Sequence, residues 1–337
     1  MTARPRVVVL APAALFRSFF DAARERRLAR SFDWKRVAGG SVTPTVRRAL
    51  RDAEALVTTW DSPRFGMELV ALAPRLRLVA HCGGEVKARF AQGLFERLVI
   101  ANAPGPMAER VAELAVTFVL MAARRVDEYR AALRRPSNRV YARLHRDGAG
   151  NETLRGRTVG ILGFGRIGRE TARLLRPFGP RLLAHDPYVR AAAVRASGAE
   201  AVSLARLLRE SAQLVIAAGL TARTRGLVGR SELARMPDGA TLVNVARGGI
   251  VDLQALTAEV RSGRLRCALD VTDPLEPLPT RHPLRRMRGA VLTPHVGAAS
   301  VEVRRAMADL VLDALERFFH GARVRTRVVP RMLERMT

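Results

Sequence analysis

Cysteine, lysine and aromatic residues are scarce in this chain of 337 residues. Its two cysteines, Cys82 and Cys267, lie far apart in the sequence, which excludes a disulfide framework and favours a reducing compartment. No apolar run reaches the ~18 residues that a membrane-spanning helix needs. We therefore expect no membrane partner, and we predict no metal site.

Acidic residues are few beside basic ones, because 58 Lys and Arg against 31 Asp and Glu give a net charge of +27. A charge of this size invites a nucleic-acid hypothesis. Only Lys35 and Lys87 are lysines, however, and the arginines are scattered over nearly every predicted helix, with no basic tail and no patch interleaved with aromatic residues. This preference is typical of a GC-rich genome as much as of phosphate binding. We expect weak, salt-sensitive contact with polyanions and no specific nucleic-acid partner.

Short apolar runs alternate with helix-like segments along the whole chain. The predicted strands are residues 7–10, 55–58, 76–80, 98–101, 159–162, 182–184, 214–218, 241–245, 267–271 and 290–292. Among the predicted helices are residues 108–125, 191–196, 204–208, 233–236, 253–261 and 303–319. Residues 134–152 carry no period and read as a connecting loop. The alternation predicts an α/β fold with parallel sheets and helices on their faces.

A glycine-rich turn follows the strand at 159–162 and opens a helical pattern. Gly163, Gly165 and Gly168 have the G-x-G-x-x-G spacing. The first glycine allows the tight turn, the second lets the backbone approach a pyrophosphate, and the third lets the helix pack close to the strand. The motif alone would also fit a plain turn, but its place between strand and helix predicts a dinucleotide-binding domain.

The next predicted strand ends at Asp186, whose carboxylate can accept both ribose hydroxyls of an adenosine. An acid here repels a 2′-phosphate, and Pro187 and Tyr188 supply no cation, so NAD is predicted over NADP.

The start of the chain imitates a secretion signal, with Arg4 and Arg6 before an apolar run. Because that run also fits a buried strand and a nicotinamide enzyme needs a cytosolic cofactor pool, we expect a cytoplasmic protein.

Two loops at the carboxyl ends of strands in the first half should face the crevice where ligands of open α/β sheets bind. Paired glycines let backbone N–H groups approach an anion such as a carboxylate. The tryptophan in the other loop fits an aromatic plug over the core equally well. The residues expected at the substrate are Trp60, His81, Gly83, Gly84 and Glu85.

The predicted helix at 108–125 is apolar around most of its circumference and follows a hinge at residues 102–105. A helix that is apolar on more than one stripe must be buried by more than one surface. We expect it to lie both between the domains and in the interface of a homodimer.

Three segments of the second half resemble signature segments of the D-isomer-specific 2-hydroxyacid dehydrogenases. These segments are MPDGATLVNVARGGIVD, ALDVTDPLEPLP and LTPHVGAAS. Residues 102–113, 154–168 and 220–240 are similar to the family's hinge and dimer helix, its cofactor turn and the segment before its catalytic arginine. The resemblance implies two doubly wound parallel-sheet domains. One is a Rossmann NAD-binding domain, residues 102–299, and the other is a flavodoxin-like substrate domain built from residues 1–101 and 300–337.

The resemblance also implies a catalytic set of Arg247, Glu276 and His295. A guanidinium can bind the carboxylate of a 2-oxo acid with two parallel hydrogen bonds, which lysine cannot. Histidine titrates near neutrality, and a carboxylate partner favours its protonated form. Glu276 would hold the ring while His295 donates a proton in reduction or accepts one in oxidation.

On the cofactor side, the resemblance implies contacts from Arg166 and Ile167 at the helix start, from Asp186, from the backbone of Val245 and Ala246, and from Asp270 to the nicotinamide amide. Three positions depart from the family's pattern. Gly219 replaces a frequent proline, Lys87 a frequent aspartate, and Glu85 a common glycine. Because a carboxylate would repel an acidic substrate, we expect the backbone of Glu85 to face the ligand.

The leading prediction is therefore an NAD-dependent dehydrogenase that interconverts a 2-oxo acid and a D-2-hydroxy acid. An NAD-sensing transcriptional regulator or scaffold on the same fold is the alternative. A third interpretation is formate or phosphite oxidation, but the formate branch resembles a Gln–His pair, and Glu276 argues against it. Because no domain is appended before Thr337, we do not expect a long-form phosphoglycerate dehydrogenase. The sequence leaves open which acid is the substrate and which direction the reaction takes.

Overall fold

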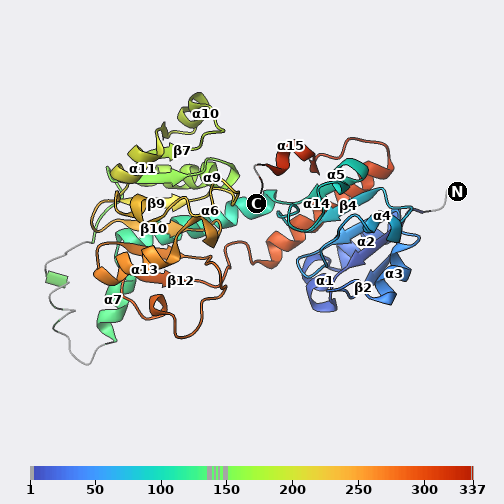
Figure 1. The fold of residues 1–337 in the computed structure, drawn as a ribbon, viewed down its shortest axis with the longest axis horizontal. Helices are drawn as coiled ribbons and strands as arrows, with labels where there is room; N and C mark the ends of the chain where they lie inside the picture. The colour runs from blue at the N-terminus through green and yellow to red at the C-terminus, as the bar shows by residue number, and fades with distance from the viewer. Residues whose placement is uncertain are drawn as a thin grey trace. The chain divides into compact units, whose positions relative to one another are not determined.

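The computed structural model describes residues 4–134, 139, 142, 145, 146, 151–334 and 336. The chain divides into two compact units (Figure 1). Unit 1 comprises Met1–Met107 and Ala299–Thr337, and unit 2 comprises Ala108–Ala298.

Unit 1 is built on a six-stranded sheet in the order β13-β5-β4-β3-β1-β2. Neighbouring strands are parallel except for the short antiparallel edge strand β13. The strands are β1 (Arg6–Leu10), β2 (Asp33–Val37), β3 (Ala55–Thr58), β4 (Leu78–His81), β5 (Val99–Asn102) and β13 (Arg327–Val328). The helices are α1 (Ala13–Phe19), α2 (Ala22–Ser31), α3 (Pro44–Leu50), α4 (Leu69–Leu72), α5 (Leu94–Arg97), α14 (Val301–Phe319) and α15 (Pro330–Leu333).

Both faces of this sheet are covered, because successive residues of a strand point to opposite faces. Val7 and Val9 of β1 pack with helices α1, α2 and α14, whereas Val8 and Leu10 pack with α3, α4 and α5. Near-continuous apolar runs therefore form the inner strands. The edge strand β2 has the polar sequence DWKRV and was not predicted, because it has no apolar run.

Unit 2 is built on a seven-stranded parallel sheet in the order β12-β11-β10-β9-β6-β7-β8. The strands are β6 (Thr158–Leu162), β7 (Arg181–His185), β8 (Glu200–Ala201), β9 (Gln213–Ile216), β10 (Thr241–Asn244), β11 (Arg266–Leu269) and β12 (Ala290–Leu292). Its α-helices include α6 (Gly105–Ala123), α7 (Val126–Leu133), α9 (Arg166–Leu175), α10 (Ala191–Ala196), α11 (Leu204–Glu210), α12 (Arg230–Leu233) and α13 (Leu253–Ser262). The strand order reverses between β6 and β9, which is the point where such sheets bind ligands.

The predicted α/β class with two parallel sheets is confirmed. The helix predicted at 233–236 was placed too late, because α12 spans Arg230–Leu233. Its start is fixed by Glu232, whose carboxylate accepts hydrogen bonds from the Gly229 N–H and the Ser231 hydroxyl.

Most of the loop predicted at 134–152 lies outside the described residues. Among the helices of the described part, none has the length and hydrophobicity that crossing a bilayer requires.

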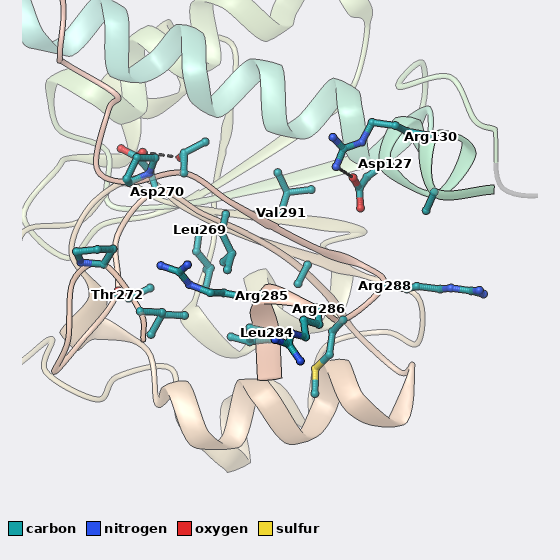
Figure 2. Close-up of a pocket in the computed structure, with 18 of the residues that line it drawn as sticks. Asp127, Arg130, Leu269, Asp270, Thr272, Leu284, Arg285, Arg286, Arg288 and Val291 are labelled. Atoms are coloured by element: carbon teal, nitrogen blue, oxygen red, sulfur yellow. Dashed lines mark hydrogen bonds and ion pairs between the residues drawn. The ribbon is translucent and has the colours of Figure 1, made fainter. Parts of the chain in front are cut away.

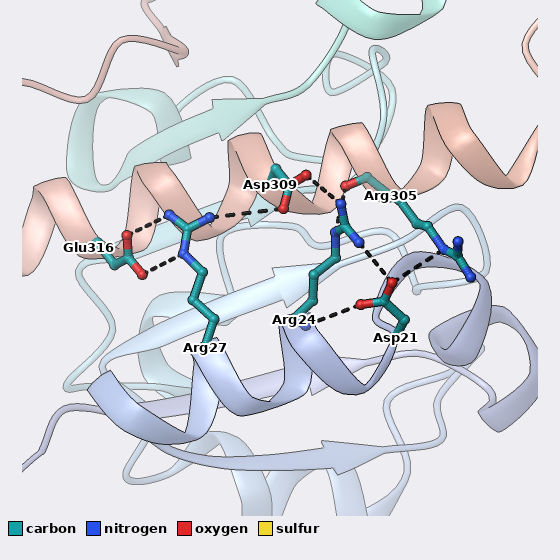
Figure 3. A network of polar contacts seen from close by, with 6 residues as sticks. All are labelled: Asp21, Arg24, Arg27, Arg305, Asp309 and Glu316. Atoms are coloured by element: carbon teal, nitrogen blue, oxygen red, sulfur yellow. Dashed lines mark hydrogen bonds and ion pairs between the residues drawn. The ribbon is translucent and has the colours of Figure 1, made fainter.

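Charged side chains join helices α2 and α14, which are far apart in the sequence (Figure 3). The Arg27 guanidinium donates two hydrogen bonds to the Glu316 carboxylate, at 2.8 and 2.6 Å. Arg24 donates to Asp309 and, at 2.9 Å, to Asp21, which also caps the start of α2. The hydrogen bond from the Arg24 backbone N–H lowers the pKa of Asp21. These bonds attach helix α14 to the N-terminal part of unit 1.

We predict that Arg27→Met lowers the free energy of unfolding by about 1 kcal/mol, because a bidentate pair is at the upper end for partly exposed ion pairs. Urea unfolding followed by circular dichroism measures this. Arg26→Met is the matched control, since Arg26 is an exposed residue of the same helix with no ion pair among the described residues. Equal losses in both variants would show that net charge, not this pair, sets the effect.

Candidate active site

The glycine turn between β6 and α9 requires glycine at its first and third positions. Gly163 has a φ of +90°, and an added Cβ would lie 2.5 Å from the Ala218 backbone nitrogen. A Cβ on Gly168 would lie 2.2 Å from the Gly163 carbonyl oxygen. Gly165 has open space around it, so a ligand can approach its backbone there. Arg166 and Ile167 follow in the first turn of α9, where N–H groups without helical partners suit a phosphate.

Asp186 is fixed at the end of β7 by two backbone donors. Its carboxylate accepts from the Phe164 N–H at 2.7 Å and from the Tyr188 N–H at 2.9 Å. The first bond joins Asp186 directly to the glycine turn. A carboxylate with two accepted bonds retains capacity for further donors such as ribose hydroxyls.

Gly219, where the family often has proline, lies in a loop that threonine side chains hold in place. Thr224 donates its hydroxyl to the Gly219 carbonyl at 2.7 Å, and the Thr221 N–H donates to the Thr224 oxygen at 2.7 Å. Side-chain hydrogen bonds therefore restrain this loop.

Arg247 follows β10 in a tight local network. The Asn244 side chain donates to the Arg247 carbonyl and accepts from the Ala246 N–H, both at 3.0 Å. The guanidinium donates to the Ala246 carbonyl at 2.7 Å and is not within ion-pair distance of any carboxylate of the described residues. The two residues before it, Val245 and Ala246, are buried. This half-buried cation is available to an anionic ligand.

His295 and Glu276 come together as a hydrogen-bonded pair. The distance between His295 Nδ1 and Glu276 Oε2 is 3.1 Å, and the side chains are 47% and 35% exposed. The second oxygen of Glu276 accepts from the Thr272 N–H at 3.3 Å. The other ring nitrogen of His295, Nε2, has no partner in the described part of the chain. The pair therefore presents Nε2 as a site where a proton can be given or taken.

Asp270 holds the loop that carries His295. Its side chain is buried and accepts from the Thr293 hydroxyl at 2.6 Å and from the Val296 and Gly297 N–H groups at 2.8 and 2.9 Å. Its carbonyl also accepts from the His295 N–H at 2.8 Å. The sequence did not indicate this role, because no local pattern reports hydrogen bonds between β11 and a later loop. A contact of Asp270 with the nicotinamide amide stays a prediction.

A cavity of about 670 Å³ opens within unit 2 next to Glu276 (Figure 2). Asp270, Thr272 and Glu276 contribute to its wall, and His295 and Arg247 do not line it. The remaining wall is mostly apolar and also includes five arginines, namely Arg130, Arg134, Arg285, Arg286 and Arg288. No three His, Cys, Asp or Glu side chains of the described residues lie close enough to hold a metal ion.

The predicted substrate loops both belong to unit 1. Trp60 packs edge-on against Phe19, with ring centroids 5.2 Å apart, and under the Arg304 guanidinium at 5.3 Å. An added Cβ on Gly83 would lie 2.5 Å from His81 Nε2 and 2.9 Å from Trp60 Nε1, so only glycine fits there. The backbone N–H groups of Gly84 and Glu85 donate to no described residue. The first loop therefore carries a packed tryptophan, and the second carries two backbone amides that have no partner among the described residues.

His81 is a buried residue of unit 1, although the sequence suggested that it faces the crevice. Its side chain is 0% exposed because it points into the interior beside Gly83. Nδ1 lies 2.9 Å from the Thr58 hydroxyl, and Nε2 has no partner in the described part of the chain. Burial, together with the charge of Arg89, lowers the pKa of His81 to about 3. The residue is therefore neutral, and its contact with a substrate stays a prediction.

Comparison with known proteins gives consistent matches for this chain. The family model described as "D-isomer specific 2-hydroxyacid dehydrogenase, NAD binding domain" matches residues 116–297. A glyoxylate reductase of Aeropyrum pernix is 38% identical over 284 residues, which cover 82% of this chain and 83% of that protein.

Two solved structures share the fold over nearly the whole chain. The apo form of Rhodotorula graminis D-mandelate dehydrogenase has a TM-score of 0.84 at 26% identity and covers 96% of this chain and 97% of its own. The NADPH-dependent glyoxylate/hydroxypyruvate reductase of Sinorhizobium meliloti, in complex with citrate, has a TM-score of 0.76 at 28% identity. It covers 97% of this chain and 98% of its own.

We predict that unfolding at pH 5 takes up about one proton fewer in His81→Asn than in the wild-type protein. In the folded chain His81 has a pKa of about 3, below the ordinary 6.5, so its proton is bound on unfolding. The stability that it contributes is therefore present above pH 6.5 and is lost as the pH falls toward 3. Urea unfolding across this range measures the slope. A wild-type slope in the variant would contradict the assignment.

Proposed function

Since the chain belongs to the D-isomer-specific 2-hydroxyacid dehydrogenase family of NAD(P)-dependent oxidoreductases, we propose that it interconverts a small 2-oxo acid and the D-2-hydroxy acid. The observation that carries the proposal is the His295–Glu276 pair with its free Nε2. A bound nicotinamide dinucleotide supplies or accepts the hydride. The chain's own residues bind the acid and move the proton.

Arg247 binds the substrate carboxylate in this proposal. The guanidinium is half-buried, keeps no carboxylate partner of its own among the described residues, and is held by the Ala246 carbonyl. Its fork of donors matches a carboxylate with two parallel hydrogen bonds. In unit 1, the N–H groups of Gly84 and Glu85, which have no partner among the described residues, are suited by themselves to a carboxylate. An anion bound by these two N–H groups would contact the backbone of Glu85 and not its side chain.

His295 serves as the general acid and base. Glu276 is held by the Thr272 N–H, accepts the hydrogen bond of Nδ1 and thereby orients the ring. Nε2 can then donate a proton to the oxo oxygen in reduction and accept it in oxidation. Proton transfer by a positioned side chain contributes roughly 10²- to 10⁴-fold in rate.

We propose NAD rather than NADP as the cofactor. Asp186 is fixed at the end of β7 with its negative charge next to the glycine turn. That charge attracts ribose hydroxyls and repels a 2′-phosphate. The Sinorhizobium meliloti relative is NADPH-dependent, so the choice within this fold depends on such local residues.

The substrate proposed is a small 2-oxo acid such as glyoxylate or hydroxypyruvate, as the names of similar proteins suggest. We also propose a homodimer formed through the helix at 108–125. Most of α6 already packs in unit 2, but the next helix, α7, exposes Val126 and Leu133 at 45% and 64%. Exposed apolar side chains continuing from that helix support an interface between two copies.

The proposed activity is tested by the loss of NADH absorbance with glyoxylate, hydroxypyruvate and pyruvate. We expect turnover that is faster with NADH than with NADPH. His295→Gln should lower kcat/KM by about 10²- to 10⁴-fold because the proton donor is lost. His282→Gln, which changes a histidine outside the pair, should stay near the wild-type value. A folded protein that turns over none of these acids would contradict the proposal.

The proposed dimer is tested by light scattering coupled to size exclusion. We expect a mass of two chains for the wild-type protein and a shift toward one chain for Leu133→Glu, because a buried unpaired charge opposes association. Leu275→Glu is the control, since Leu275 is an apolar residue of unit 2 that is 55% exposed. A monomeric wild-type protein would overturn the dimer.

A further inference from the structure

Trp60 is held on three sides in unit 1. Phe19 packs against the edge of its indole, and the Arg304 guanidinium lies over its face. Its carbonyl oxygen accepts a hydrogen bond from Arg89 at 2.7 Å. These contacts come from separate elements and restrict the conformations of both the side chain and the backbone of Trp60.

The guanidinium of Arg89 forms hydrogen bonds with backbone carbonyl groups. One guanidinium nitrogen donates to Trp60 and the other to the Ser62 carbonyl at 3.2 Å. Its Nε is buried with no partner in the described part of the chain, and no described carboxylate lies within ion-pair distance. Partial burial of a cation is costly, so these two charge-assisted bonds are what keep it in place.

Arg89 lies four residues after Glu85, in the segment that continues from the second predicted substrate loop. The Arg89 N–H donates to the Val86 carbonyl at 3.1 Å, and the Arg89 carbonyl accepts from the Phe65 N–H at 2.8 Å. One residue therefore joins the loop at 59–63, through its side chain, to the loop that begins at Gly83, through its main chain.

We propose that Arg89 is a positioning residue for substrate binding, which fixes the Trp60 loop against the Gly83–Gly84 loop so that both present one preformed surface. The inference rests on the proposed function, which assigns these loops to the 2-oxo acid. A preformed site saves the ordering cost that a mobile loop would pay on binding. Because Arg247, Glu276 and His295 belong to unit 2, loss of Arg89 affects binding more than chemistry.

The first experiment follows Trp60 directly and needs no turnover. The chain has two tryptophans, so Trp34→Phe leaves Trp60 as the only one. In this background, Arg89→Met should shift the emission to longer wavelength and raise quenching by acrylamide about twofold or more, because the loop is released. Arg64→Met is the matched control, since Arg64 is an exposed cation near Arg89 with no hydrogen bond in the described residues. Unchanged emission and quenching in Arg89→Met would overturn the proposal.

The second experiment separates KM from kcat for the oxo acid that the wild-type protein reduces best. Arg89→Met should raise KM about tenfold, because the released loops must be ordered when the acid binds, and leave kcat within about threefold. Arg89→Lys should fall between, because an ammonium cannot span two carbonyls as a fork does. An unchanged KM, or a loss confined to kcat, would overturn the proposal.

The two experiments distinguish the two claims. If the wild-type protein reduces no 2-oxo acid, the proposed function fails, and the fluorescence of Trp60 still decides whether Arg89 holds the loop. Circular dichroism checks that each variant folds. If Arg89→Met does not fold, Arg89→Lys serves in both experiments, since it keeps the charge and most of the aliphatic stem.

Discussion

The geometry of the candidate active site depends on the buried carboxylate of Asp270. A carboxylate without partners in the interior would be very unfavourable, so the following loop has to bring donors to it. The Thr293 hydroxyl and the N–H groups of Val296 and Gly297 supply them. Between these donors, His295 is held with a φ of 54°, in the left-handed region that is uncommon for residues other than glycine. His295, the proposed proton donor, thus takes its position from a buried carboxylate that its own side chain does not contact.

In both units, side chains that follow the parallel strands form hydrogen bonds that hold the loops proposed to bind ligands. In unit 2, Asp186 and Asn244 at the ends of β7 and β10 each bond to the backbone next to them. In unit 1, Arg89 and the Thr58–His81 pair hold the loops after β3 and β4. Hydrogen bonds of this kind restrain the loops, and a restrained loop lowers the ordering cost of binding a ligand.

The net charge of +27 is better understood through single arginines than through a binding surface. Arg89 donates to two backbone carbonyls, and Arg264 donates to the carbonyls of Leu233 and Met236 as well as to Glu259. Arg24 and Arg27 attach one helix to another. A guanidinium has five donors in a fixed plane, so it can join backbone segments in a way that lysine cannot. Part of the excess of arginine is therefore internal to the fold.

The sequence is sufficient to predict the fold class and the glycine turn, because apolar runs and glycine spacing are local signals. It also indicates Arg247, Glu276 and His295 through their motifs, and their roles are proposals. Folding of the chain set the remaining contacts. It paired Glu276 with His295, buried His81 behind Gly83, and gave Asp270 and Arg89 their partners. Such contacts join residues that are distant along the chain, and the pattern around each residue does not report them. The polar edge strand β2 was missed for the same reason, since only its pairing with β1 makes it a strand.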